Sequence, residues 1–145
     1  MINIKLLTTT ATVPFRDTPE EAGLDICADE SFTLQPNERK LVKTGVSMQT
    51  PTGTFTKIEP RSKLANKFGI QIMGGVVDSN YKGEVMVIMF NTGDKPLEVE
   101  VGDAIAQLVT YNIMIETPEV VEDLGESLRG ARGVNCDDLR LRKTK

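Results

Sequence analysis

One segment of this chain has the residue types and spacing of an anion-binding site. In residues 60–69 a proline precedes Arg61 and Ser62, and the helix-compatible run that follows stops at Gly69. A short helix that begins here would present free backbone N–H groups at its start, next to a hydroxyl and a guanidinium. These donors all bind phosphate oxygens, so we expect this segment to bind a phosphate.

A second segment, residues 74–84, has the pattern of a reactive hairpin. Its Gly-Gly pair lets a ligand approach bare backbone, and Val76 and Val77 predict an extended lead-in. Asp78 follows at the mouth of a turn that returns through Gly83 into a very apolar run. A phosphate-binding segment beside a turn with one carboxylate indicates an enzyme that acts on nucleotides.

The composition limits the classes of protein and partner. At 145 residues the chain fits one domain, and because aromatic residues are few and tryptophan is missing, its core should be aliphatic. The formal net charge of −4 argues against a nucleic-acid partner, since binding along a nucleic-acid backbone requires a basic surface. A polyanionic substrate therefore needs local arginine and lysine, or a metal ion.

The sequence contains no histidine. This excludes serine or cysteine nucleophiles that depend on an imidazole base, and it removes the commonest ligand of transition metals. Carboxylate base chemistry and an oxygen-bound Mg2+ remain as the natural options. Any catalytic base should therefore be an aspartate.

The sequence gives few signals of cellular location. Cys27 and Cys136 lie in unrelated contexts, the start has no secretory signal pattern, and no apolar stretch is long enough to span a bilayer. We expect a soluble, intracellular protein in a reducing compartment, cytoplasmic or nuclear, without a membrane partner. A viral protein made in a host cell fits this description equally well.

Glycine and proline residues recur at short intervals and bound runs that are rich in valine, isoleucine and threonine. This spacing predicts an all-β sandwich or barrel. The helix that we expect is short and lies near residues 62–67. The expected strands lie near residues 2–7, 24–28, 31–34, 38–47, 54–59, 70–77, 84–91, 97–101 and 104–115.

The run at residues 85–90 is apolar on both faces of its expected strand. Since a sandwich strand needs one apolar face, the second face meets either a neighbouring subunit or another part of the same chain. From residue 127 onward the sequence alternates charges and glycines without a period, which predicts a mobile arm. We therefore divide the chain into a β domain at residues 1–126 and an arm at residues 127–145.

Four short motifs follow one another along nearly the whole domain. They are Ala22-Gly-Leu-Asp-Ile-Cys-Ala28, Pro60-Arg-Ser-Lys-Leu-Ala65, Gly75-Val-Val-Asp-Ser-Asn-Tyr-Lys-Gly-Glu84 and Gly102-Asp-Ala-Ile-Ala-Gln-Leu108. In order and approximate spacing they resemble the first four motifs of trimeric dUTPase, the dUTP diphosphatase. The resemblance implies a jelly-roll-like β-clip domain with one short helix, and a homotrimer whose active sites combine motifs of more than one subunit. It also implies Mg2+-dependent hydrolysis of dUTP to dUMP and pyrophosphate, which removes dUTP from the nucleotide pool and supplies dUMP for dTMP synthesis.

The resemblance gives roles to the hairpin residues. Asp78 resembles the carboxylate that orients and deprotonates the attacking water and contacts the sugar 3′-hydroxyl, although an aspartate here also fits a simple Asx turn. Tyr81 resembles the ring that packs under deoxyribose and excludes a 2′-hydroxyl; the alternative is a hairpin aromatic that covers the core. Gly75 resembles the position whose main-chain groups pair with the uracil edge, against the alternative of a strained turn. Val76 and Val77 complete the expected substrate contacts of this segment.

The other motifs supply the expected phosphate contacts and the metal ligand. Arg61 and Ser62 resemble the pair that contacts the phosphates, and Gln107 resembles an amide that also reaches them; the alternatives are a surface arginine, a helix cap and a strand glutamine. Lys63 stands where the family has a small residue, so its amide would still serve the phosphate while its ammonium adds a contact or crowds it. Asp25 resembles the acid that holds the Mg2+ shell through water, or else caps a turn, and the metal itself should lie mainly on the triphosphate.

The chain also departs from the family pattern. Asn80 and Lys82 replace an aspartate and an arginine of the hairpin, which removes a negative charge and a planar guanidinium. Residues 129–138 match only part of the family's glycine-rich fifth motif. There Arg129 fits, whereas Val134 replaces the aromatic residue that would stack on uracil, and we expect both to contact the substrate.

Two interpretations of function remain. An active dUTP diphosphatase would bind Mg2+ across the phosphates and use water held by Asp78 to attack the α-phosphorus, so that pyrophosphate leaves. A nucleotide-sensing or protein-binding module on the same scaffold would have lost catalytic closure and gained a protein partner through its altered arm. Asp78, Tyr81 and Gln107 favour the enzyme. A related deaminase of dCTP shares the scaffold, but Tyr81 and the first motif fit it less well.

Overall fold

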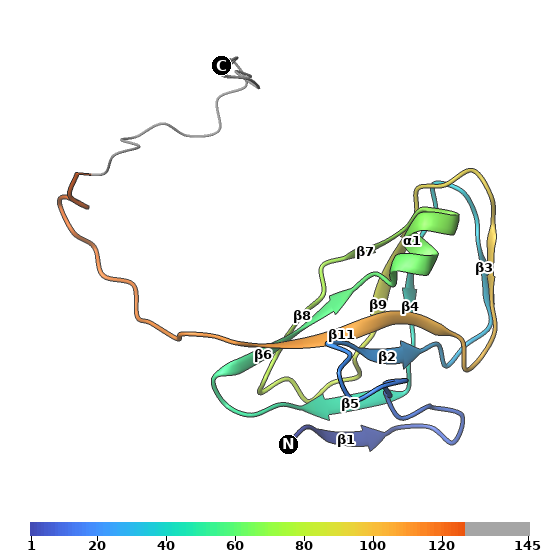
Figure 1. Cartoon of the computed structure of the whole chain (residues 1–145), viewed down its shortest axis with the longest axis horizontal. Coiled ribbons are helices and arrows are strands. Elements are labelled where there is room, and N and C mark those ends of the chain that lie inside the picture. The colour runs from blue at the N-terminus through green and yellow to red at the C-terminus, as the bar shows by residue number, and fades with distance from the viewer. Residues whose placement is uncertain (127–145) are drawn as a thin grey trace, which may run out of the picture. The chain divides into compact units, whose positions relative to one another are not determined.

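The structure, a computed structural model, describes residues 1–126 of the chain. Within this part, Met1–Ile115 form one compact unit (Figure 1). Its elements in chain order are β1 (Asn3–Leu6), β2 (Leu24–Cys27), β3 (Phe32–Leu34), β4 (Arg39–Val42), β5 (Val46–Gln49), β6 (Thr54–Glu59), α1 (Ser62–Phe68), β7 (Ile70–Met73), β8 (Val76–Asp78), β9 (Val87–Asn91), β10 (Leu97–Val99) and β11 (Ala104–Asn112). This is the all-β domain with one short helix that the sequence predicted.

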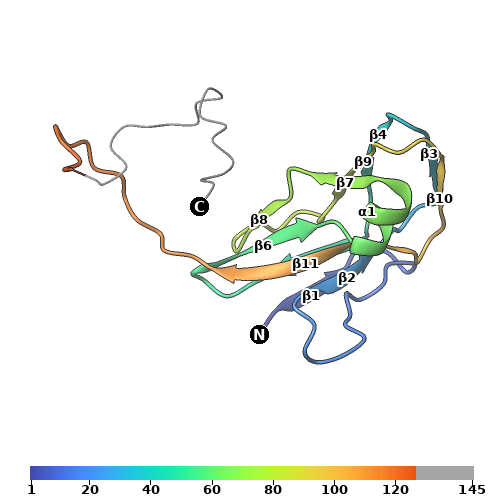
Figure 2. The same ribbon diagram turned by 45° about the horizontal axis from the view of Figure 1, so that its top comes forward.

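The strands of the described part form four antiparallel sheets. The largest has the order β2-β11-β6-β8, and a three-stranded sheet has the order β4-β9-β7. Two pairs, β1-β5 and β10-β3, complete the unit. In Figure 2, β2, β11 and β6 run side by side, although β11 follows β2 by most of the chain. Such pairing of distant strands is typical of jelly-roll topology, so the predicted jelly-roll-like fold is confirmed.

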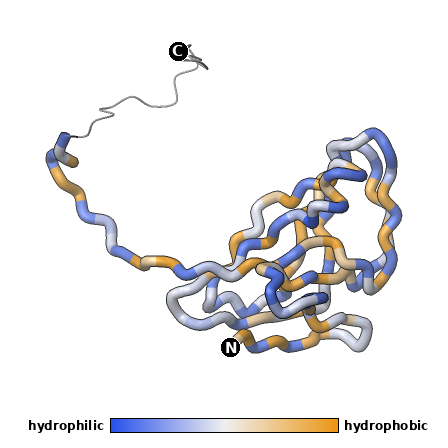
Figure 3. Tube along the Cα trace, in the orientation of Figure 1, coloured by the Kyte–Doolittle hydropathy of each residue, from blue (hydrophilic) through white to orange (hydrophobic). Residues whose placement is uncertain are grey.

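The core is aliphatic, as the composition predicted. Its fully buried side chains come from both larger sheets and from β3, and they include Ile26, Leu34, Val87, Met89 and Leu108. Figure 3 shows apolar positions in short stretches along the strands, interrupted by polar ones. Burying one large aliphatic side chain contributes about 1.5–3 kcal/mol, so this core supplies the main stabilising term.

Two of the predicted strands are each divided in two, and this part of the prediction was wrong. The expected strand at residues 38–47 breaks into β4 and β5 around Gly45, whose φ is +64°. The expected strand at residues 70–77 breaks into β7 and β8 at Gly74 and Gly75, with φ of +66° and +93°. A positive φ takes the backbone out of the β region, so pairing cannot continue through these glycines.

Helix α1 is placed as predicted and ends one residue later. Arg61 precedes it in an extended conformation, with φ −79° and ψ 129°. Gly69 ends it in the left-handed region at φ 70°, and its N–H donates to the carbonyl of Ala65 at 3.0 Å. This is the glycine C-cap that the sequence indicated. None of the helices described for residues 1–126 has the length and apolar character needed to cross a membrane.

Strand β9 explains the doubly apolar run. The expected strand at 84–91 begins later, at Val87, because Glu84 forms only an isolated bridge to Ser47. Alternate residues of β9 are buried in the core, and the others point to the outer face of the β4-β9-β7 sheet. There Leu41, Ile88 and Met73 form one cross-strand row, in which Leu41 is 51% exposed and Met73 is 40% exposed. We call these three residues the outer apolar row.

Candidate active site

The turn after β8 presents a carboxylate and an aromatic ring together. Asp78 ends β8, where it lies opposite Phe55 of β6 in an antiparallel register. The N–H of Tyr81 donates to the carbonyl of Asp78 at 3.0 Å and closes the turn that the sequence predicted. Asp78 is exposed, and the Tyr81 side chain is 43% exposed rather than packed over the core. Both side chains are therefore accessible to a ligand.

Gly75 brings bare backbone to the same region. Its φ of +93° lies in the left-handed range that side chains rarely adopt. Its carbonyl accepts the N–H of Ile58 at 2.8 Å, and a Cβ at residue 75 would lie only 2.9 Å from the carbonyl oxygen of Ile58. No side chain fits here unless β6 moves, which is the physical reason for the glycine.

A cavity of about 210 Å³, which we call the hairpin cavity, joins these features. Its walls include the predicted contact residues of the hairpin segment, namely Gly75, Val76, Val77, Asp78 and Tyr81. The other lining residues are Leu41, Ile58, Glu84, Val85, Met86 and Ile88. The sequence did not predict these as contacts. Leu41, Ile58 and Ile88 come from β4, β6 and β9, which only the fold brings here, whereas residues 84–86 directly follow the hairpin in the sequence. A small, largely apolar cavity with a carboxylate on its wall suits an organic ring.

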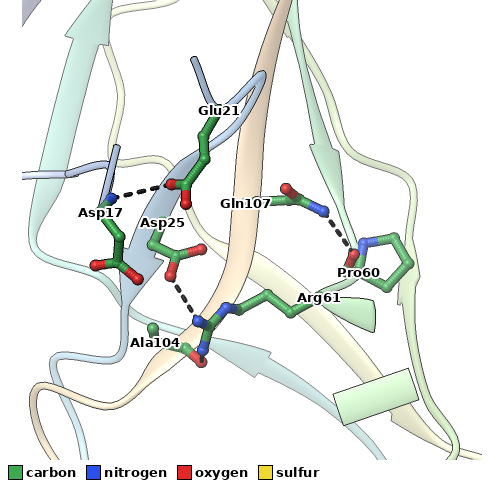
Figure 4. A network of polar contacts seen from close by, with 7 residues as sticks. All are labelled: Asp17, Glu21, Asp25, Pro60, Arg61, Ala104 and Gln107. Carbon is green, nitrogen blue, oxygen red and sulfur yellow. Dashed lines mark hydrogen bonds and ion pairs between the residues drawn. The ribbon is translucent and has the colours of Figure 1, made fainter. Parts of the chain in front are cut away.

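A second cavity, of about 290 Å³, forms around the start of α1, and we call it the cationic cavity. The name refers to its two basic residues, which lie beside three carboxylates. Its lining residues are Asp17, Glu21, Ala22, Gly23, Asp25, Arg61, Ser62, Lys63 and Gln107. Figure 4 shows Arg61 pointing toward Asp25, with Nη2 2.6 Å from Oδ2, while Nη1 donates to the carbonyl of Ala104 at 2.9 Å. A guanidinium carries five N–H donors, so Arg61 keeps donors for an anion.

The strand register explains why Gln107 lies in this cavity. On β11, Gln107 is opposite Asp25 of β2 and opposite Glu59 of β6, so one cross-strand row brings the first, second and fourth motifs together. Its amide Nε2 donates to the carbonyl of Pro60 at 3.0 Å. A Cβ at Gly23 would overlap Gln107 Oε1, so the glycine of the first motif makes room for this amide.

Two acidic residues of the cationic cavity were missed at the sequence level. The side chain of Glu21 accepts the N–H of Asp17 at 2.9 Å, and Arg16 Nε donates to the carbonyl of Glu21 at 2.7 Å (Figure 4 shows the first contact). Burial raises the pKa of Asp25; the Arg61 guanidinium opposes this, and the charges of Asp17 and Glu21 add to it. The signal was a cluster of charges before the first motif, but loop residues have no periodicity that would place them.

Comparison with known proteins identifies the family. The dUTPase family model matches residues 9–136. The chain belongs to the dUTPase family. It is 39% identical over 130 residues to the deoxyuridine 5′-triphosphate nucleotidohydrolase of Paramecium bursaria Chlorella virus 1, a match that covers 90% of this chain and 92% of the relative.

Solved structures of phage dUTPases have the same fold. The Staphylococcus bacteriophage 80alpha dUTPase with dUPNHPP matches this chain with a TM-score of 0.86 at 26% identity, over 92% of this chain and 95% of that one. A mutant dUTPase from phage phi11 of S. aureus, described with a coordinated structural Mg(II) ion, matches with a TM-score of 0.81 at 24% identity, over 86% and 98% of the two chains. The shared architecture covers most of this dUTPase-family chain.

The predicted site residues of this dUTPase-family chain fall into two groups. The hairpin cavity and the cationic cavity have no lining residue in common. Asp78 therefore lines the hairpin cavity, and Arg61 lines the cationic cavity. Arg129 and Val134 lie outside the described residues, as does the rest of the arm at 127–145.

A metal ion in the cationic cavity would be bound by single carboxylates and not by a cluster of protein ligands. Among residues 1–126 no three or more Asp, Glu, Cys or His side chains converge as a metal-binding group. Mg2+ usually keeps several waters and is held by one or two carboxylates together with substrate phosphates. Asp25, with its carboxylate facing Arg61 in the cavity, fits that mode of binding and does not fit an all-protein metal cage.

Proposed function

We propose that this protein hydrolyses dUTP to dUMP and pyrophosphate by means of a water molecule that Asp78 orients and deprotonates. The observation that carries the mechanism is the hairpin geometry. An accessible carboxylate, an aromatic ring and bare glycine backbone line one small cavity, in a chain that belongs to the dUTPase family. A carboxylate is the expected general base because the chain has no histidine.

The hairpin cavity is the proposed site of the nucleoside. Main-chain groups beside Gly75 would pair with the uracil edge, in a backbone conformation that the absence of a Cβ allows next to Ile58. Val76 and Val77 would contact the base from the same strand. Tyr81 would pack against the deoxyribose, so that a 2′-hydroxyl is excluded; its partly exposed ring on the cavity wall supports this role.

The cationic cavity is the proposed site of the triphosphate. Arg61, Ser62, Lys63 and Gln107 line it together, and their guanidinium, hydroxyl, ammonium and amide groups are all donors to phosphate oxygens. Lys63 adds a positive charge near Arg61, which supports a contact rather than a clash. Neutralisation by several donors of this kind favours departure of pyrophosphate, because negative charge develops on the leaving phosphates.

We assign to Asp25 the binding, through water, of a Mg2+ ion whose main ligands are the phosphates of the substrate. Bound there, the ion would neutralise phosphate charge and make the α-phosphorus a better electrophile. The chain's own contribution is to present one carboxylate, and Arg61 Nη2 orients it from 2.6 Å. A mutant of the phi11 dUTPase is described with a structural Mg(II) ion, which supports Mg2+ as a metal that a protein of this fold binds.

The proposed assembly is a homotrimer in which neighbouring subunits share each active site. Two observations support it. The outer apolar row leaves Leu41 and Met73 largely exposed, and such surface is expected to be covered by a protein partner. The two cavities share no lining residue within one chain, which fits a site that takes its nucleoside contacts from one chain and its phosphate contacts from another. Arg129 and Val134 of the arm remain proposed substrate contacts.

The test is release of pyrophosphate from dUTP, dCTP, dTTP and UTP, each with and without Mg2+. We expect turnover of dUTP that depends on Mg2+, and little turnover of the other three. Comparable turnover of dTTP or UTP would contradict the proposed base and sugar contacts. Tight binding of dUTP without release of pyrophosphate would instead support the sensing module.

A further inference from the structure

Glu84 binds two successive backbone N–H groups with one carboxylate oxygen. Its Oε1 accepts from the N–H of Thr44 at 3.1 Å and from the N–H of Gly45 at 2.8 Å. Hydrogen bonds to a carboxylate are roughly twice as strong as those between neutral groups. Gly45 has φ +64°, and a Cβ there would lie 2.6 Å from the Cβ of Ala11. The β4–β5 turn is thus a well-defined anchor for this side chain.

Three further hydrogen bonds join the same two segments. Thr44, which is fully buried, donates its hydroxyl to the carbonyl of Val85 at 2.5 Å. The N–H of Val85 donates to the carbonyl of Val46 at 2.7 Å, and the hydroxyl of Ser47 donates to the carbonyl of Lys82 at 3.0 Å. These bonds lie on both sides of residue 84 in the sequence, so the returning half of the hairpin is tied to the β4–β5 segment.

The ring of Tyr81 takes its position from residue 84 as well. Its hydroxyl donates to the main-chain carbonyl of Glu84 at 3.1 Å. The ring also folds over Gly83, where a Cβ would overlap the hydroxyl oxygen. Since the side chain is 43% exposed, core packing alone does not fix its orientation. The orientation depends instead on where the backbone of residue 84 is held.

We propose that Glu84 is a positioning residue: its carboxylate anchors the hairpin to Thr44 and Gly45, and this anchoring holds the Tyr81 ring where it discriminates against ribonucleotides. The inference rests on the proposed function, which places the sugar against that ring. Glu84 acts through Tyr81 and takes no part in the proton transfer assigned to Asp78. Its loss should therefore reduce sugar selectivity more than it reduces chemistry on a bound nucleotide.

The experiment compares Glu84→Ala and Glu84→Gln with wild type in kcat/KM for dUTP and for UTP. Glu84→Ala should lower the dUTP/UTP ratio about tenfold, the size expected when a hydroxyl-excluding contact loosens. Glu84→Gln keeps an oxygen that can accept both N–H groups, so its ratio should stay within about threefold of wild type. The matched control is Glu30→Ala, since Glu30 accepts the N–H of Lys43, the residue next to the same anchor, at 2.9 Å. It should cost stability and leave the ratio unchanged.

Amide hydrogen exchange provides a readout that needs no turnover. The N–H groups of Thr44 and Gly45 should exchange faster in Glu84→Ala and remain protected in Glu84→Gln.

Equal dUTP/UTP ratios in Glu84→Ala and Glu30→Ala would overturn the proposal, as would unchanged exchange at both amides. If Glu84→Ala does not fold, Ser47→Ala must lower the ratio in the same direction by a smaller factor, and an unchanged ratio there overturns it too. Wild-type protein that fails to hydrolyse dUTP would contradict the proposed function, while the exchange data would still decide whether Glu84 holds the turn.

Discussion

Gly75 admits no side chain, because its backbone conformation and the surrounding space both exclude one. A Cβ would meet the carbonyl of Ile58, a backbone group of β6 that is held by pairing with β11 and cannot rotate away. Asp78, in contrast, is exposed at the end of β8, so a change of its side chain should disturb packing little and report on its proposed chemistry. The two positions therefore give different tests of the site, one of binding and one of catalysis.

Gly75→Ala should weaken substrate binding. Forcing an alanine into a left-handed conformation costs of the order of 1–3 kcal/mol. The Cβ would lie 2.9 Å from the Ile58 carbonyl oxygen, so the backbone at residue 75 must shift and misplace the main-chain groups proposed to pair with uracil. KM for dUTP should therefore rise about tenfold or more. The matched control is Gly53→Ala, where φ is +82° but nothing lies within 4 Å of the added Cβ. It should lose similar stability and keep its KM. Steady-state kinetics with dUTP decide, and equal KM values in both variants would contradict a base contact at Gly75.

Asp78→Asn should separate catalysis from binding. The amide keeps the shape of the carboxylate but cannot take a proton, so turnover should fall by about 10²–10⁴-fold while the Kd for dUTP changes little. Pyrophosphate release measures the first quantity, and calorimetric titration of the inactive variant with dUTP measures the second. Asp94→Asn makes the same charge change at an exposed loop residue that lines neither cavity, and it should keep wild-type turnover. Undiminished turnover in Asp78→Asn would move the base to another residue.

At the scale of elements, local patterns predicted the strands and the helix, but not where strands break. Gly69 ends α1 as expected because a glycine after a helical run is a local signal. At Gly45 the break comes from a positive φ, and Ala11 and Asp29, from distant parts of the chain, leave no room for a Cβ there, which no local pattern shows. Similarly, the sequence predicted the hairpin and anion-binding segments, whereas the acidic residues Asp17 and Glu21 enter the cationic cavity only through tertiary folding.

Glu30 ties the segment before β3 to β4 and to the turn that follows it, and it makes stability depend on pH. Burial tends to raise the pKa of Glu30, but the hydrogen bond from the N–H of Lys43 and the ammonium of Lys40, 3.0 Å away, outweigh it and lower the pKa below 4.5. The folded state thus prefers the ionised form. The stabilisation is present above the unfolded-state pKa and is lost as pH falls through the lower folded-state pKa.

Glu30→Gln should remove this contribution while keeping an acceptor for Lys43. At neutral pH the wild type should be more stable by up to about 1 kcal/mol, a small value because the pair is partly exposed to solvent. The difference should shrink as pH is lowered below 4.5. Urea unfolding of both proteins at one protomer concentration across that range measures it. A difference that stays constant with pH would show that the carboxylate charge has no part in the effect.

At the scale of the whole molecule, the outer apolar row and the separation of the cavities lead to the same assembly. A cross-strand row of Leu41, Ile88 and Met73 gives a neighbouring chain an apolar surface to cover. Leu41 and Ile88 also line the hairpin cavity, so a partner that covers the row reaches the edge of the nucleoside site. Subunit contact and active-site completion would then depend on the same surface, and the protein should sediment at about three times the 15.9 kDa chain mass.

Mixing two inactive variants tests whether active sites are shared. Asp78→Asn leaves the cationic cavity intact, and Arg61→Ala leaves the hairpin cavity intact, because the cavities have no lining residue in common. If each site takes Asp78 from one subunit and Arg61 from another, random reassembly of an equimolar mixture gives about one quarter of the sites both native residues. We expect pyrophosphate release from dUTP by the refolded mixture to reach about that fraction of the wild-type rate.

Each variant unfolded and refolded alone is the control and should stay inactive. The mixture could have trimer mass and yet be no more active than the average of the two variants. That result would place Asp78 and Arg61 of one chain in the same site, and it would contradict sharing.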